Sequence, residues 1–163
     1  MSTNETKTSP AASSDTQQVS NPLTFVFELK SPEYALKAKN YLASAEVQEK
    51  VNDALIKIGT VHFARFVFLS PLQLSVITTY DGDFDKYIQA FTDELGDIFD
   101  TLIGYSYHPD GLIPVAQNLA NFQDYVRKND RSFVDGVLQP EFSAYPTLTV
   151  YQILSLQNSL PNG

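Results

Sequence analysis

The chain has 163 residues, 43% of them hydrophobic, with 11 Phe and 9 Tyr, which is enough to fill one ordinary hydrophobic core. It has no cysteine and two histidines, which excludes disulfides, thiolate metal sites and cysteine nucleophiles. A formal net charge of −8 argues against a nucleic-acid partner, and the absence of any hydrophobic run near the roughly 20 residues of a spanning helix argues against a membrane.

The first 22 residues differ in composition from the rest of the chain. They hold nine Ser or Thr and two Pro but no aromatic residue, so they cannot bury enough apolar surface to offset the entropy lost on ordering. The sequence therefore predicts a disordered tail over residues 1–22 and a single domain over residues 23–160. The tail has neither the basic start nor the hydrophobic stretch of a secretory signal, which predicts a cytoplasmic protein.

A strand and a helical segment open the predicted domain. Hydrophobic residues occupy alternate positions over residues 23–30, which is typical of a strand with one core face. Ser31 and Pro32 predict a helix start, and hydrophobic residues at helical spacing continue up to Gly59, which predicts the helix end. We expect this helix to break near Ser44.

Two strands and a second helix are predicted next. Residues 60–69 and 72–80 are rich in β-branched and aromatic residues and are separated by a Ser-Pro break, which predicts a hairpin. The Asp-Gly-Asp sequence over residues 81–83 predicts the start of a helix whose hydrophobic face runs over residues 84–102. Residues 103–108 follow directly and are the candidate for one more strand.

This order of elements predicts the fold class. Strand, helix, strand, strand, helix and strand make an α+β, ferredoxin-like βαββαβ sandwich, with helices on one face of an antiparallel sheet. From about residue 110 we expect a C-terminal extension, with a helix over residues 112–126 and an extra strand over residues 132–138. Thr149 and Gln152 have the form of a capping box and predict a short helix over residues 150–157.

The predicted strand over residues 60–69 has hydrophobic residues on both faces. Its two alternating sets are Val61, Phe63, Val67 and Leu69, and Ala64, Phe66 and Phe68. An antiparallel sheet with one solvated face alternates hydrophobic and polar residues, and two helices cover only one face. We therefore expect a homodimer in which a second copy packs sheet to sheet, forming a dimeric α+β barrel. The C-terminal extension is the alternative cover.

Three segments resemble a known protein family. Residues 61–67 (VHFARFV) and 79–87 (TYDGDFDKY) are similar to the HFAR and YDG pattern of an uncharacterised bacterial family with a ferredoxin-like, dimeric α+β barrel fold. Residues 142–150 (FSAYPTLTV) are similar to its YSAYPGLTV segment, so the resemblance covers about residues 60–155. It implies that fold and no particular activity. The wider superfamily of such barrels includes small monooxygenases and haem enzymes.

His62 and Arg65 are the only basic residues in the predicted hairpin. They are three positions apart, which places them on opposite faces of a regular strand. A buried charge without a partner is costly, so each residue needs one. The alternatives are a hydrogen bond to a neighbouring strand, an ion pair with an acid such as Asp81, or a bound ligand.

Three further residues complete the candidate ligand-binding set. His108 follows Tyr107 in a segment ending in Pro and Gly, and imidazole can act as an acid, a base or a metal ligand near neutral pH. Ligand pockets are mostly apolar with a few converging polar groups. We therefore expect the polar end of a pocket to use His62 or His108, helped by Tyr80 or Tyr107.

No motif in the chain identifies a reaction. The glycine patterns of phosphate loops, dinucleotide sites and nucleophile elbows are absent. The acidic residues 81–85 are not followed by the Gly and Glu that a calcium loop has at its sixth and twelfth positions, so no metal site is predicted.

The sequence thus predicts a protein of unknown function, a homodimer that binds a small apolar or aromatic ligand without a cofactor. Two enzyme classes are the alternatives. In a cofactor-independent monooxygenase, His62, Arg65 or His108 would orient an aromatic substrate. In a haem-dependent oxidoreductase, His108 or His62 would be the axial ligand.

Overall fold

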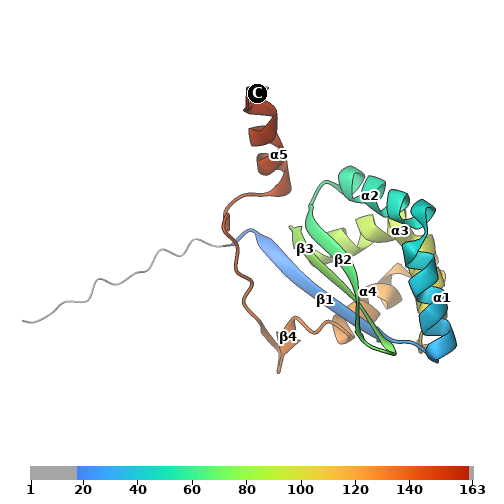
Figure 1. Ribbon diagram of the computed structural model, residues 1–163. Helices are drawn as coiled ribbons and strands as arrows, with labels where there is room; N and C mark the ends of the chain where they lie inside the picture. Colours follow the sequence, from blue (N-terminus) through green and yellow to red (C-terminus); the bar gives the residue numbers. More distant parts are fainter. Residues whose placement is uncertain (1–17, 162–163) are drawn as a thin grey trace, which may run out of the picture.

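Residues 18–161 are described by a computed structural model and form an α+β structure (Figure 1). A three-stranded antiparallel sheet has the strand order β1-β3-β2, with β1 at Ser20–Glu28, β2 at Val61–Ser70 and β3 at Gln73–Asp81. The α-helices of this part of the chain are α1 (Pro32–Ala43), α2 (Ala45–Ile58), α3 (Phe84–Gly104), α4 (Leu119–Lys128) and α5 (Val150–Ser159). The predicted α+β class is confirmed.

Strand β1 begins earlier than the sequence predicts. Its register runs from Ser20 opposite Asp81 to Glu28 opposite Gln73, because its first residues pair with the end of β3. Residues 20–22, predicted as part of a tail, therefore belong to the sheet. The rest of the predicted tail, residues 1–17, lies outside the described residues.

The helical segment after β1 breaks where the sequence predicts. The side chain of Ser31 caps α1 by accepting a hydrogen bond from the backbone N–H of Tyr34. Ser44 ends α1 and begins α2: its hydroxyl donates to the carbonyl of Tyr41 over 2.7 Å and accepts from the N–H of Val47. One serine thus satisfies backbone groups of both helices.

Gly59 ends α2 in a left-handed conformation, with φ at 68°. This conformation costs roughly 1–2 kcal/mol in a residue with a Cβ atom, so Gly59→Ala should lower the free energy of unfolding by about that amount. Gly104 lies at the end of α3 without a positive φ, and an added Cβ meets nothing within 4 Å. Gly104→Ala is therefore the control. Urea unfolding of both variants is the measurement, and equal losses would contradict the conformational explanation.

The hydrophobic core lies between the sheet and α3, with α4 beside it (Figure 1). Helix α3 is 21 residues long and supplies the largest share, namely Tyr87, Ile88, Phe91, Leu95, Ile98, Phe99, Leu102 and Ile103. The alternate residues predicted to face the core, which are Leu23, Phe25 and Phe27 of β1 and Leu29 just after it, are all at most 3% exposed. The prediction for the core face of β1 is therefore confirmed.

The predicted strand over residues 103–108 is wrong. Helix α3 continues through Gly104, because the side chains of Leu102 and Ile103 are fully buried at helical positions of the core. Beyond the helix only Ser106 forms a bridge, to Leu29 just after the end of β1. Backbone hydrogen bonds still hold this segment against the free edge of β1, including one of 2.8 Å from Tyr107 to Glu28.

The C-terminal extension differs from the prediction in two places. The helix predicted over residues 112–126 is a short 3₁₀ helix (Val115–Gln117) followed by α4, because Pro114 has no N–H group to continue an α-helix. The strand predicted over residues 132–138 is a hairpin of β4 (Phe133–Val134) and β5 (Val137–Leu138). Its Asp-Gly turn has positive φ angles, which two-residue hairpins require. The capping box that begins α5 is confirmed.

One face of the sheet lies opposite the core and is here called the outer face. It includes Phe63 and Arg65 of β2, which lie opposite Thr79 and Ile77 of β3. Residues 139–161, here called the arm, cross one end of this face, where the N–H of Val19 donates to a carbonyl of the arm over 2.8 Å. Beyond this contact α5 projects away from the sheet (Figure 1).

Candidate functional site

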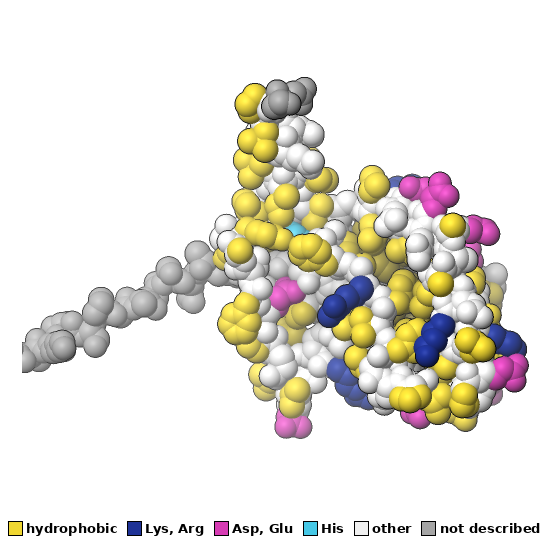
Figure 2. All heavy atoms as spheres, in the orientation of Figure 1, with side chains coloured by type: hydrophobic (Ala, Val, Ile, Leu, Met, Phe, Trp, Pro, Cys, Tyr) yellow, Lys and Arg dark blue, Asp and Glu magenta, His cyan; other side chains and the backbone are white. Residues whose placement is uncertain are grey.

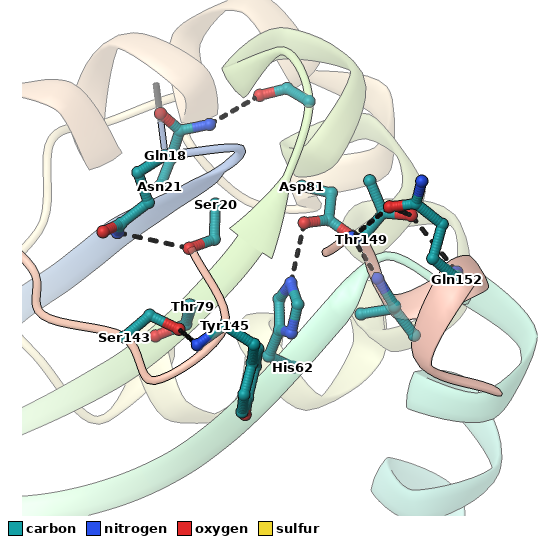
Figure 3. Close-up of polar contacts among 12 residues, drawn as sticks. Gln18, Ser20, Asn21, His62, Thr79, Asp81, Ser143, Tyr145, Thr149 and Gln152 are labelled. Carbon is teal, nitrogen blue, oxygen red and sulfur yellow. Dashed lines mark hydrogen bonds and ion pairs between the residues drawn. The ribbon is translucent and has the colours of Figure 1, made fainter. Parts of the chain in front are cut away.

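His62 is the centre of a buried polar network at the start of β2 (Figure 3). Strand β2 has one extra residue relative to β3 at this point, a bulge, so the regular alternation of faces is interrupted. His62 Nε2 lies 2.7 Å from Asp81 Oδ1, and the His62 side chain is 4% exposed. Its ring stacks on Tyr145 of the arm, with centroids 6.2 Å apart. The pairing with Asp81 is one of the alternatives predicted for a buried basic residue.

The prediction that His62 and Arg65 lie on opposite faces of the strand is wrong, because of this bulge. A regular strand would place them on opposite faces, but the extra residue turns His62 toward the arm, on the outer face to which Arg65 also belongs. Arg65 is exposed and makes no ion pair with any of residues 18–161. The two basic residues therefore share a face, although only His62 has a partner.

Asp81 joins β2 to the beginning of α5. While Oδ1 contacts His62, Oδ2 accepts a 2.7 Å hydrogen bond from the backbone N–H of Val150, the first residue of α5. A carboxylate at this position also interacts favourably with the positive end of the helix dipole. The capping box of Thr149 and Gln152 satisfies the next backbone groups (Figure 3). Asp81 therefore anchors the point from which α5 leaves the body.

Glu141 fixes the earlier part of the arm to the outer face. Its Oε1 accepts a hydrogen bond from the hydroxyl of Thr79, and its Oε2 accepts from Ser20 Oγ over 3.2 Å and from Gln18 Nε2 over 3.0 Å. These contacts join residues that are more than 60 positions apart in the sequence. Glu141 and the His62–Asp81 pair therefore both hold the arm on the sheet.

Each histidine has one ring nitrogen in contact with another group of the chain. Nε2 of His62 lies 2.7 Å from Asp81 Oδ1, and the His62 ring stacks on Tyr145. His108 lies at the other end of β1, where its Nδ1 is 3.0 Å from the carbonyl of Ser106. The haem alternative of the sequence analysis therefore stays a prediction.

The five predicted site residues do not form one site. Tyr107 is 63% exposed and lies with His108 near the end of β1, whereas His62 lies near its beginning. Tyr80 is the neighbour of Asp81 in β3, yet it faces the core and stacks on Tyr87 with ring centroids 3.9 Å apart. The side chains of Tyr80 and His62 are therefore on opposite sides of the sheet.

Tyr80 lines a cavity of about 370 Å³ on the core side of the sheet. This volume falls within the range of small-molecule pockets. Segments distant in sequence form the walls: the first residues of β1, the start of α3, the end of α4 and the β4–β5 hairpin. The lining residues are Asn21, Pro22, Tyr80, Phe84, Arg127, Asp130, Phe133 and Leu138. Here this space is called the Tyr80 cavity.

The polar groups of the Tyr80 cavity are held in place by their own contacts. Asp130 is 8% exposed, and its Oδ1 accepts hydrogen bonds from the backbone N–H groups of Thr24 and Ser132. The guanidinium of Arg127 lies 4.7 Å from the ring centroid of Phe84 and pairs with two aspartates outside the lining. Burial, followed by the charge of Asp130, raises the pKa of Tyr80 to about 12. Its hydroxyl, like that of any tyrosine, is neutral near pH 7 and can donate a hydrogen bond.

The raised pKa of Tyr80 makes stability at alkaline pH depend on this side chain. Tyrosine ionises near pH 10 in the unfolded chain and near pH 12 at this position in the folded protein. The unfolded state therefore loses its proton first, and stability that is present below pH 10 is lost as the pH rises to 12. In Tyr80→Phe the free energy of unfolding should fall less steeply over this range. Urea unfolding at successive pH values is the measurement, and parallel curves would contradict the assignment.

Sequence reasoning missed most residues of the Tyr80 cavity. The Asp-Gly turn at residues 135–136 is a signal for the hairpin that carries Phe133 and Leu138. No local pattern indicates that Arg127 and Asp130 lie near Tyr80.

Among residues 18–161, no group of three or more His, Asp or Glu side chains could hold a metal ion. No helix in this range is long and apolar enough to span a bilayer.

Comparison with known proteins found no matching family model, no matching curated protein and no matching solved structure. The resemblance of the HFAR and YDG segments to a dimeric α+β barrel family therefore stays a prediction.

Proposed function

We propose that the Tyr80 cavity binds a small aromatic or apolar molecule that carries a hydroxyl or amino group. The observation that carries this proposal is the combination of apolar walls with two polar groups, the neutral Tyr80 hydroxyl and the Asp130 carboxylate. Oδ1 of Asp130 accepts two backbone N–H groups, and no hydrogen bond from residues 18–161 reaches Oδ2. A ligand hydroxyl can therefore accept from Tyr80 and donate to Asp130.

The charges around the cavity favour a neutral or cationic ligand over an anionic one. Asp130 lines the cavity, and Asp83 and Asp85 are close enough to contribute to the raised pKa of Tyr80. The single basic lining residue, Arg127, is already paired with Asp85 and Asp124. A carboxylate ligand would meet mainly like charges, which lowers its affinity.

The proposed architecture is ferredoxin-like, except that segments without regular strand structure lie beside β1, where the fourth strand of that fold would be. The strand order β1-β3-β2 leaves the outer edge of β1 for a fourth strand. Two segments bridge to that edge, through Ser106 with Leu29 and Asp130 with Phe25. The second bridge supports a role for this edge in the cavity, because it holds Asp130 beside β1.

The proposed site differs from that expected for the monooxygenase alternative. That alternative requires His62, Arg65 or His108 to orient the substrate, and none of them lines the Tyr80 cavity. A binding function needs only the apolar walls and the two polar groups. We therefore propose ligand binding rather than catalysis.

Titration with 2-naphthol, followed by its fluorescence, tests the proposal. Wild-type protein should bind this probe, and Tyr80→Phe should weaken binding about 2- to 13-fold, the equivalent of one hydrogen bond. Naphthalene lacks the hydroxyl, so its affinity should not change in Tyr80→Phe. Tyr107→Phe removes a hydroxyl from an exposed tyrosine outside the cavity and is the matched control. Absence of 2-naphthol binding, or equal losses in the two variants, would overturn the proposal.

A further inference from the structure

Asp130 places a buried carboxylate in the wall of the Tyr80 cavity. The residue is 8% exposed, and among residues 18–161 no Lys, Arg or His forms an ion pair with it. Arg127 lines the same cavity, but its guanidinium pairs with Asp85 and Asp124 instead. A buried carboxylate without a cation is costly, because burial removes the water that would stabilise its charge. The cavity therefore favours a ligand that supplies a positive charge.

The hydrogen-bonding groups that the cavity offers to a ligand are mainly acceptors. Oδ1 of Asp130 already accepts two backbone N–H groups, which leaves Oδ2 as an acceptor. Asn21 lies opposite Tyr80 in the sheet register, and its Nδ2 donates to the carbonyl of Gly82 over 3.0 Å, which leaves its Oδ1 as another acceptor. The Tyr80 hydroxyl can accept as well as donate. A primary ammonium group has three N–H donors and no acceptor, so it matches this set better than a hydroxyl, which has one donor.

The apolar walls of the cavity favour an aromatic ring on the same ligand. Phe84 forms one wall, and Phe133 and Leu138 of the β4–β5 hairpin form another. Phe133 is 48% exposed and Leu138 is 42% exposed, and hydrophobic side chains gather on this hairpin in Figure 2. A ring that covers them would gain roughly 25 cal/mol for each Å² of apolar surface removed from water. The cavity thus offers acceptors for a charged end and hydrophobic surface for a ring.

We propose that the ligand of the Tyr80 cavity is a primary arylalkylamine in its cationic form, with its ammonium group at Asp130 and its ring against Phe84 and Phe133. This ligand class rests on the proposed binding function of the cavity and narrows it from hydroxyl or amino compounds to one class. The formal net charge of −8 also favours the approach of a cation over that of an anion.

Tryptamine and three analogues with the same ring test the ligand class on the wild-type protein. The chain contains no tryptophan, so indole fluorescence excited beyond the absorption of tyrosine reports the ligand alone. Tryptamine should bind at least about 5-fold more tightly than tryptophol, which has a hydroxyl in place of the ammonium group. N,N,N-trimethyltryptammonium keeps the charge but has no N–H donor on it, so it should bind at least about twofold more weakly than tryptamine. Indole-3-acetate is an anion and should bind most weakly.

Asp130→Asn removes the charge and keeps the hydrogen bonds within the chain. Its amide oxygen replaces Oδ1 as the acceptor of the two backbone N–H groups, so the NH₂ group takes the place of Oδ2. The affinity for tryptamine should fall about 10- to 150-fold, and that for tryptophol less than about threefold. Asp110→Asn removes the same charge from an exposed residue outside the cavity lining and is the matched control. Far-UV circular dichroism verifies that both variants are folded.

Three outcomes would overturn the amine class. They are tryptophol or indole-3-acetate binding as tightly as tryptamine, equal affinities for tryptamine and its trimethyl analogue, and an unchanged tryptamine affinity in Asp130→Asn. The first two need no variant, so they decide the question even if Asp130→Asn does not fold. If 2-naphthol binds while one of these outcomes is found, the cavity binds neutral aromatic molecules and only the amine class is wrong. If neither 2-naphthol nor tryptamine binds, the proposed binding function is wrong as well.

Discussion

Phe25→Ala is expected to lower the free energy of unfolding by about 3–5 kcal/mol, the range for removing a buried aromatic ring. Phe25 is 1% exposed, and its ring contacts those of Phe27, Phe122 and Tyr125 with centroids 5.1–6.4 Å apart. The substitution leaves a cavity between β1 and α4 and removes three aromatic contacts. Urea unfolding followed by circular dichroism is the measurement.

Leu36→Ala is the control for this substitution. Leu36 is 58% exposed on α1, so its truncation should change the free energy of unfolding by no more than about 0.5 kcal/mol. A loss in Phe25→Ala below about 1.5 kcal/mol would show that the site collapses around the missing ring, contrary to the close packing of protein interiors.

Asp81→Ala is expected to have the second largest effect, a loss of about 2–4 kcal/mol, because it leaves buried groups without their partner. The His62 side chain is 4% exposed and that of Asp81 is 10% exposed, so water replaces the lost contact poorly. The N–H of Val150 also loses its acceptor. Besides lower stability in urea, the variant should show faster hydrogen exchange at the first turn of α5.

Asp81→Asn removes the negative charge but keeps a side chain of the same shape that can form hydrogen bonds. The amide oxygen can still accept from the N–H of Val150, but the NH₂ group can donate to His62 only in the tautomer whose Nε2 carries no proton. The free energy of unfolding of Asp81→Asn should lie between that of wild type and that of Asp81→Ala. An Asp81→Ala variant with wild-type stability and unchanged exchange at α5 would mean that the arm is held by Glu141 alone.

Local signals predicted the elements that depend on neighbours in sequence. The hairpin of β2 and β3 combines two β-rich segments with a Ser-Pro break, and the capping box at Thr149 is a contact within one helical turn. The break at Ser44 belongs to the same class, because a serine hydroxyl satisfies the backbone beside it. Such features need little information from the rest of the fold.

Features set by tertiary packing were missed. Residues 103–108 contain β-favouring tyrosines, but burial of Ile103 in the core extends α3 into this range. The bulge at His62 changes which face that residue occupies, and no residue type in the strand indicates it. The Tyr80 cavity joins four distant segments, so Tyr80 could be named as a candidate while Asp130 could not.

Tyr80 and Asp81 are consecutive residues of β3, and their side chains point to opposite faces of the sheet. The proposed cavity and the anchor of the arm therefore share one peptide unit. If a ligand that moves Tyr80 changes the equilibrium for attachment of the arm by some factor, attachment of the arm must change the affinity for that ligand by the same factor, because the coupling free energy is reciprocal. The state of the arm on one face of the sheet would then set how strongly the other face retains its ligand.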